Sequence, residues 1–293
     1  MAVSLDFSGS GSYSTRERRK GFILALPALI WLGLFFIFPL LIVVLVSFLT
    51  RGTRGALTLP LTFEHYERIL GPVFRPVFID SIVIALITTL VCVLLGYPLA
   101  FFISTRRSKR LQNISLFLVI LPFWTNFLVR TYAWRVLLGT DGTINVTLMN
   151  LHLITEPLTL LNTDFAVLIG LVYGFLPFMV LPIYSSVERF EFRLVEAAHD
   201  LGANDVQAFF RVVLPLTLPG VIAGCILVFI PAIGSFITPD LLGGTAGIMI
   251  GNLIQGQFRG SGNWPLGSAA SIVMMAIVML GLVVYLRLGN RKA

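Results

Sequence analysis

The sequence predicts an all-α, polytopic membrane protein with six transmembrane helices. Two observations lead to this prediction. First, 57% of the 293 residues are hydrophobic and only 12% are charged, which is about half of the charged fraction of an average soluble chain. Second, the apolar residues are gathered in long blocks without Asp, Glu, Lys or Arg, namely 21–50, 81–105, 111–129, 165–187, 212–239 and 260–286. A single buried helix of a soluble protein would explain one such block but not six.

The length of each block is near or above the roughly 20 residues that a helix needs to cross a bilayer. Inside lipid the backbone must satisfy its own hydrogen bonds, so we expect these blocks to be helical. Together they define one transmembrane domain, residues 21–288, between a basic N-terminal segment, 1–20, and a short tail, 289–293. The Gly/Ser-rich stretch 8–14 is expected to be disordered.

The first block follows a cluster of basic residues, which is also the pattern of a removable signal peptide. The apolar run is much longer than a signal core, and no small-x-small cleavage site ends it. We therefore expect a retained first helix.

Basic residues predict the orientation of the helices. With six spans both termini lie on one side, and the segments on that side hold most of the 21 Lys and Arg residues. By the positive-inside rule this side is the cytoplasm. The net charge of +7 is thus explained by topology, and a nucleic-acid surface is a poor explanation for charges divided among four short segments.

Several residues within the blocks predict bends and close packing. Proline bends a transmembrane helix, and GxxxG pairs allow two helices to approach closely. Gly170 with Gly174 and Gly220 with Gly224 form such pairs, either for packing within the chain or for an interface with another membrane chain. Prolines punctuate the blocks, at Pro27, Pro39, Pro98, Pro122, Pro177, Pro182, Pro219 and Pro231.

The sequence lacks the motifs of common enzymes. It contains no GxxxxGK[ST] phosphate loop, HExxH, GxSxG or paired CxxC, so neither ATP hydrolysis nor a metal site is expected in this chain. His65, His152 and His199 are far apart in sequence, and Cys92 and Cys225 lie in apolar blocks, where cysteine usually behaves as a small hydrophobe.

The segment between the fourth and fifth blocks, residues 188–218, is longer than a simple connection requires. Val195, Ala198 and Leu201 recur at helical spacing, and Gly202 is a typical helix stop. Asp205 is then expected to cap a second short helix, 206–213, that ends at Leu214-Pro215. Two short amphipathic helices outside the membrane can dock into a groove of a soluble partner.

This segment resembles the EAA signature of ABC importer permeases. Glu196-Ala197-Ala198, Gly202 and Leu214-Pro215 have the spacing of that signature, with Val212 where isoleucine is usual. The resemblance implies the type I permease fold, in which this loop rests in a cleft of an ATP-binding subunit. Glu196 and Gly202 would then provide docking and the corner turn. Two such subunits would bind the ATP and Mg, and this chain would bind no cofactor.

Further segments carry a narrower resemblance, namely LPFWTNFLVRTYAW (121–134), YGFLPFMVLP (173–182), FIPAIG (229–234), DLLGG (240–244), IMIGN (248–252) and Trp264-Pro265. They resemble the first permease of spermidine/putrescine-type importers, and this resemblance covers nearly the whole chain after residue 20. It implies a second homologous permease, a periplasmic substrate-binding protein and a bacterial inner membrane. Related systems carry other amines or amino-acid derivatives, and a homodimer stays open.

A cationic substrate needs acidic or aromatic groups along its path through a low-dielectric region. We expect Asp240 and Trp124 to face this path; the alternatives are a helix-capping Asp240 and a Trp124 packed on a neighbour. The other polar or aromatic candidates are Thr125, Asn126, Tyr132 and Ser235. An ion-coupled secondary transporter is the main rival, but it predicts ionisable residues within the spans. An intramembrane enzyme is disfavoured because the catalytic motifs are missing.

Overall fold

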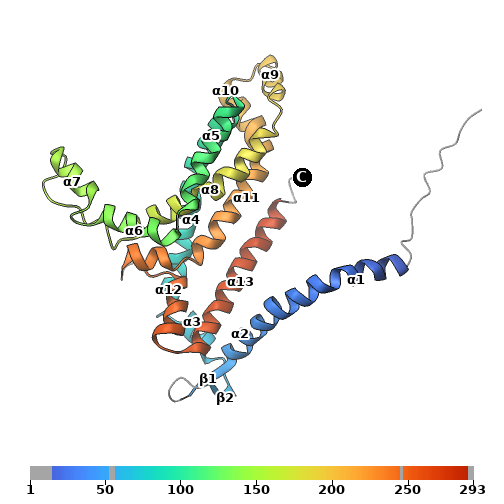
Figure 1. The fold of residues 1–293 in the computed structure, drawn as a ribbon, viewed down its shortest axis with the longest axis vertical. Helices are drawn as coiled ribbons and strands as arrows, with labels where there is room; N and C mark the ends of the chain where they lie inside the picture. The colour runs from blue at the N-terminus through green and yellow to red at the C-terminus, as the bar shows by residue number, and fades with distance from the viewer. Residues whose placement is uncertain (1–14, 53–56, 245–246, 290–293) are drawn as a thin grey trace, which may run out of the picture.

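The computed structural model describes residues 15–52, 57–244 and 247–289, and it is almost entirely helical (Figure 1). Within these residues, five helices are long and apolar enough to cross a membrane, and one bent pair of helices adds a sixth if it is counted as one span. The long helices are α1 (Thr15–Leu32), which continues through η1 (Gly33–Ile37) into α2 (Phe38–Phe48), then α4 (Arg75–Ser104), α8 (Asp164–Glu188), α11 (Leu214–Ile233) and α13 (Trp264–Gly289).

Shorter elements connect the long helices. The helical ones are α3 (Glu64–Leu70), α5 (Lys109–Ile120), η3 (Leu121–Trp124), α6 (Phe127–Leu138), α7 (Thr143–Asn150), α9 (Arg193–Asp200), α10 (Asp205–Ala208), η4 (Phe209–Val213), η5 (Pro239–Gly243), α12 (Ile250–Gln255) and η6 (Gly256–Gly260). An antiparallel hairpin of β1 (Leu49–Arg51) and β2 (Leu57–Leu61) is the one departure from an all-α fold that the described residues show.

The third predicted span, 111–129, is wrong as a single helix. The chain bends by 90° between the segments 109–124 and 127–150. Pro122 lies in the tight turn η3, and the Asn126 side chain accepts a hydrogen bond from the Leu128 amide at 2.8 Å, which caps α6. A side-chain cap competes with continuation of the helix, so the chain starts a new helix here.

The first helix also differs from its predicted bounds. It begins at Thr15, so the basic residues Arg16 to Lys20 are helical and not part of a disordered tail. The Gly/Ser-rich stretch 8–14 lies outside the described residues. A wide π-helical turn, η1, precedes Pro39. Figure 1 shows α1 leaving the body of the protein. Only 6% of the most apolar part of the span Leu24–Phe48 is buried.

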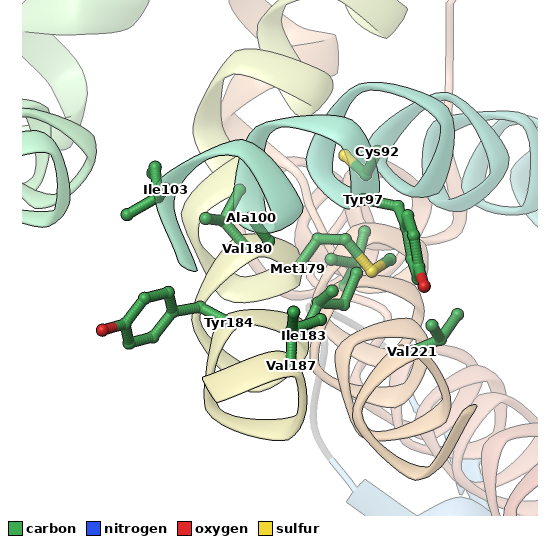
Figure 2. Close-up of a cluster of buried hydrophobic side chains, with 11 residues drawn as sticks. Cys92, Tyr97, Ala100, Ile103, Met179, Val180, Ile183, Tyr184, Val187 and Val221 are labelled. Carbon is green, nitrogen blue, oxygen red and sulfur yellow. The ribbon is translucent and has the colours of Figure 1, made fainter. Parts of the chain in front are cut away.

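The central core is formed by α4, α8 and α11 (Figure 2). Met179 of α8 is fully buried between the other two helices, beside Cys92 of α4 and Val228 of α11. A Cβ atom at Gly220 would overlap Ser186 and the Pro182 carbonyl of α8, and one at Gly224 would overlap Met179. The prediction that these glycines pack helices within the chain is thus confirmed for α11.

A second core lies nearer the hairpin end. It joins α3, α4, α12 and α13 through buried residues that include Ile69, Ile250 and Ala269. The Ser81 hydroxyl of α4 accepts a hydrogen bond from the Ile250 amide of α12 at 2.8 Å. Because α4 belongs to both cores, it connects the two ends of the molecule.

Candidate functional site

The segment 188–218 forms a projection at one end of the molecule, opposite the β-hairpin (Figure 1). The first short helix expected from the sequence is present as α9, and the expected second helix is present as α10, which is the first turn of a longer helix. Gly202 lies at the corner with φ +85°, in the left-handed region that glycine adopts without a steric penalty. The Gly202 amide donates to the His199 carbonyl at 2.8 Å, and the Ala203 amide donates to the Ala198 carbonyl at 3.0 Å. These two bonds form a Schellman motif, which ends α9.

The cap of the second helix was predicted one residue too late. Asn204, and not Asp205, is the N-cap: its side chain accepts from the Gln207 amide at 2.8 Å, and the Gln207 side chain accepts from the Asn204 amide at 3.2 Å. This reciprocal pair is a capping box. Asp205 instead lies 3.3 Å from the His199 imidazole and so connects α10 to α9.

The predicted helix end at Leu214-Pro215 is also wrong. The helix runs without interruption from Asp205 to Ile233 through η4 and α11. Proline has no amide hydrogen and its ring collides with the carbonyl four residues earlier. The wide turn η4, at 209–213, accommodates Pro215 without breaking the helix.

The candidate docking residues lie together on this projection. Glu196 and Ala197 are exposed on α9, and Ala198 is partly covered. Leu201 is 89% exposed and Val206 is 64% exposed, on either side of the Gly202 corner. Two large apolar side chains at a water-exposed corner are typical of a surface that a partner covers. Leu214 and Pro215 begin α11 and belong to the helix that carries the projection.

The candidate path residues lie on two separate segments. Thr125 and Asn126 are at the bend between η3 and α6, where the Thr125 hydroxyl donates to the Pro122 carbonyl at 2.6 Å and Asn126 caps α6. Trp124 is 76% exposed, and its ring meets Phe117 edge-on with centroids 5.7 Å apart. The polar atoms of Thr125 and Asn126 thus stabilise the bend itself.

The other path candidates are near the second bend. Ser235 follows α11, and Asp240 is exposed at the start of η5. Tyr132 is 52% exposed on α6, which packs against η5. The six candidates are thus divided among the bend at 124–126, α6 and the segment 235–240.

Sequence reasoning missed a cavity of about 500 Å³ between α11, α12 and α13. Its wall is mostly apolar and includes Phe236, Gln255, Ser271 and Met274. A Cβ atom at Gly251 would lie 2.8 Å from the Gly234 carbonyl oxygen, so a glycine is needed where the segment after α11 approaches α12. The glycines of FIPAIG and IMIGN were the available signal for this close approach.

Residues 92–292 match the family model described as binding-protein-dependent transport system inner membrane component. The chain belongs to this family. Its matched part includes the projection, both bends and the cavity, and it therefore covers the fold from α4 to α13. The chain is a multi-pass membrane protein and a permease subunit of an ABC importer.

Curated relatives extend the match to most of the chain. A spermidine/putrescine transport system permease protein, PotB, from Haemophilus influenzae is 48% identical over 89% of this chain and 92% of its own length. PotB from Escherichia coli is 45% identical over 88% and 93%. An inner membrane ABC transporter permease protein of E. coli, YdcU, is 32% identical over 92% and 89%.

Chains of solved ABC transporter structures have the same fold. A bacterial alginate ABC transporter in complex with an alginate pentasaccharide-bound periplasmic protein has a chain that superposes with a TM-score of 0.73 at 14% identity, over 94% of this chain and 96% of that one. The MetNI methionine ABC transporter in an inward-facing conformation gives 0.56 at 16% identity, over 76% and 99%. The fold is that of type I importer permeases.

Proposed function

We propose that this permease imports a small cationic amine of the spermidine or putrescine kind into the bacterial cytoplasm. It receives the amine from a periplasmic binding protein and works beside a second, homologous permease. The similarity to spermidine/putrescine permeases supports the substrate class. The chain itself is not an enzyme; two ATP-binding subunits bind ATP and Mg and hydrolyse the ATP.

The observation that carries this proposal is the exposed corner of the projection. Glu196, Leu201 and Val206 present one carboxylate and two apolar side chains around a turn that Gly202 fixes. A preformed corner loses little conformational entropy on docking, so it binds a partner's groove at a low cost. Movement of the ATP-binding subunits on ATP would then displace α9 and the helices on either side of it.

In the orientation that we propose, the projection and both termini lie in the cytoplasm. The projection carries Arg189, Arg193 and Arg211, in agreement with the positive-inside rule. The β-hairpin and α3 then lie on the outer side, where the binding protein delivers the amine (Figure 1).

The test is a leucine-to-aspartate substitution at the corner. L201D places a charge in the proposed apolar contact, and we expect co-purification of the ATP-binding subunit and ATP-driven uptake of labelled putrescine to fall about tenfold or more, because a buried unpaired charge costs several kcal/mol. The matched control is L59D in the hairpin, since Leu59 is 76% exposed at the opposite end.

The L59D variant is expected to keep the ATP-binding subunit. If L201D retains both co-purification and uptake, the docking role is wrong. If purified wild-type complex in liposomes takes up putrescine with an ion gradient and without ATP, the chain is a secondary transporter. If it imports another amine or an amino-acid derivative but neither putrescine nor spermidine, only the substrate class is wrong.

A further inference from the structure

The cytoplasmic end of α4 is packed against both halves of the projection, although α4 is not adjacent to it in sequence. The Phe101 ring of α4 lies 6.4 Å from Phe192, which precedes α9, and 6.5 Å from Phe209, which begins η4. The Tyr97 ring, one turn earlier in α4, meets Phe209 edge-on at 5.6 Å. Edge-to-face pairs at these distances stabilise the packing beyond the effect of their buried area.

A hydrogen-bond chain reinforces this packing. The Tyr97 hydroxyl lies 2.9 Å from the Thr217 hydroxyl of α11, and the Thr217 hydroxyl donates to the Val213 carbonyl at 2.9 Å. Since Thr217 uses its hydrogen on Val213, Tyr97 donates to Thr217. Figure 2 shows the Tyr97 ring directed towards the helix that carries Val221, which is α11. The bond is buried, where a hydrogen bond is electrostatically stronger than in water.

We propose that Tyr97 and Phe101 are positioning residues that transmit displacement of the projection to α4. The proposal rests on the proposed function, in which an ATP-binding subunit moves α9. The helices α8 and α11 are continuous with the projection and follow it through the backbone. Because α4 lacks that connection, it follows through side-chain packing, and Phe192, Phe209 and Thr217 supply the contacts that come from the projection and the start of α11.

At its other end, α4 contacts α12, so a displacement of α4 also affects α12. The Ser81 hydroxyl accepts the Ile250 amide of α12 at 2.8 Å, and α12 contributes Gly251 and Gln255 to the wall of the cavity beside α11. The helix of 30 residues thus has fixed contacts at both ends. Displacement of its cytoplasmic end changes the contacts of α12 at the outer end, so the aromatic link couples the docking corner to the cavity.

The test compares two neighbouring phenylalanines of α4. Phe101 contacts the projection, whereas Phe102 is 52% exposed and its ring stacks with Arg106 of the following loop. The F101L and F102L complexes are purified with their ATP-binding subunits, reconstituted in liposomes and supplied with binding protein and labelled putrescine. The quantity measured is the number of ATP molecules hydrolysed for each putrescine imported.

For F101L we expect this ratio to rise about three- to tenfold, the size of other mutational effects on coupling, with the ATP-binding subunit still attached. F101Y, which keeps the ring, is expected to restore the wild-type ratio, and F102L to leave it unchanged. An unchanged ratio in F101L overturns the proposal. If F101L does not accumulate, Y97F supplies the same comparison, since it deletes only the hydroxyl; an unchanged ratio there overturns the proposal equally.

The experiment distinguishes failure of the proposed function from failure of the proposed role of α4. A wild-type complex without an ATP-binding subunit, or with ATP-independent uptake, contradicts the proposed function. A wild-type complex with normal ATP-driven uptake and a Phe101-independent ratio contradicts only the role of α4.

Discussion

The two ends of this permease are built in different ways. At the end proposed to be cytoplasmic, a glycine corner, a capping box and a Schellman motif fix α9 and α10 within about 20 residues of chain. At the end proposed to be outer, the polar candidates are distributed over the bend at Asn126, the segment after α11 and η5. Both ends have exposed side chains, such as Leu201 at the first and Trp124 at the second, but only the first is formed by one continuous segment.

This difference fits the two tasks that we propose. A docking corner must have the same shape whenever the motor subunit engages it, so rigidity is useful there. A transport path between two permeases is shared, so that each chain contributes only part of its wall. Substitutions at the two ends are therefore expected to separate motor attachment from amine uptake.

The largest effect is expected at the glycine corner. Valine at position 202 is strained because its backbone would keep φ near +85°, which costs an ordinary residue about 1–2 kcal/mol and a β-branched residue more. We expect the G202V permease to lose the ATP-binding subunit on purification. We also expect its rate of putrescine uptake to fall at least tenfold. G202N is the control, since asparagine tolerates this conformation. Space is not the cause, because a Cβ at Gly202 has nothing within 4 Å, so equal behaviour of both variants would contradict the backbone explanation.

A smaller effect is expected from a buried amide at the outer end. The fully buried Asn145 side chain bonds the Gly139 and Leu158 carbonyls and the Leu158 amide at 2.9–3.1 Å. Its replacement by alanine leaves these groups without partners, at a cost of about 1–3 kcal/mol. N145A should increase hydrogen exchange in 139–163 and lower uptake while the ATP-binding subunit stays attached. N150A, at an exposed position on the same helix, is the control; release of the ATP-binding subunit by N145A would break the separation of the two ends.

The smallest effect is expected at Asp240. Its carboxylate is exposed to water, where two charges 4 Å apart attract by about 1 kcal/mol. D240N should lower the initial rate of putrescine uptake by about two- to fivefold, with ATP hydrolysis unchanged. D141N, an exposed carboxylate in the loop between α6 and α7, should have no such effect. Unchanged uptake in D240N would remove Asp240 from the path and leave it as a surface residue.

Local signals explain what the sequence could predict. Long charge-free blocks predict most of the spans, and Gly202 predicts the corner, because each feature depends on neighbouring residues only. Each wrong prediction has a local cause. Asn204 precedes Asp205 and takes the capping role, and the wide turn η4 accommodates Pro215. The side chain of Asn126 starts a new helix inside an apolar block.

Contacts between distant segments could not be predicted. Phe101 and Phe209 are 108 positions apart in the chain and meet only after α4 packs beside α11. The cavity beside Gly251 likewise requires three helices to be placed first. The family resemblance supplied the type I fold and the partner classes, but not these side-chain contacts.

The unbroken helix from Asp205 to Ile233 has a mechanical consequence. Near its middle, Gly220 and Gly224 bring its backbone against α8 so closely that no side chain fits between them. This contact can act as a fulcrum, with an arm of about 22 Å from Asp205 to Gly220 and one of about 14 Å from Gly224 to Ile233 at 1.5 Å per residue. A push on the Asp205 arm then swings the Ile233 arm in the opposite direction by a smaller distance. The helix that is displaced at its Asp205 end would thereby move in the opposite direction at its Ile233 end. One side of the membrane would then close as the other opens.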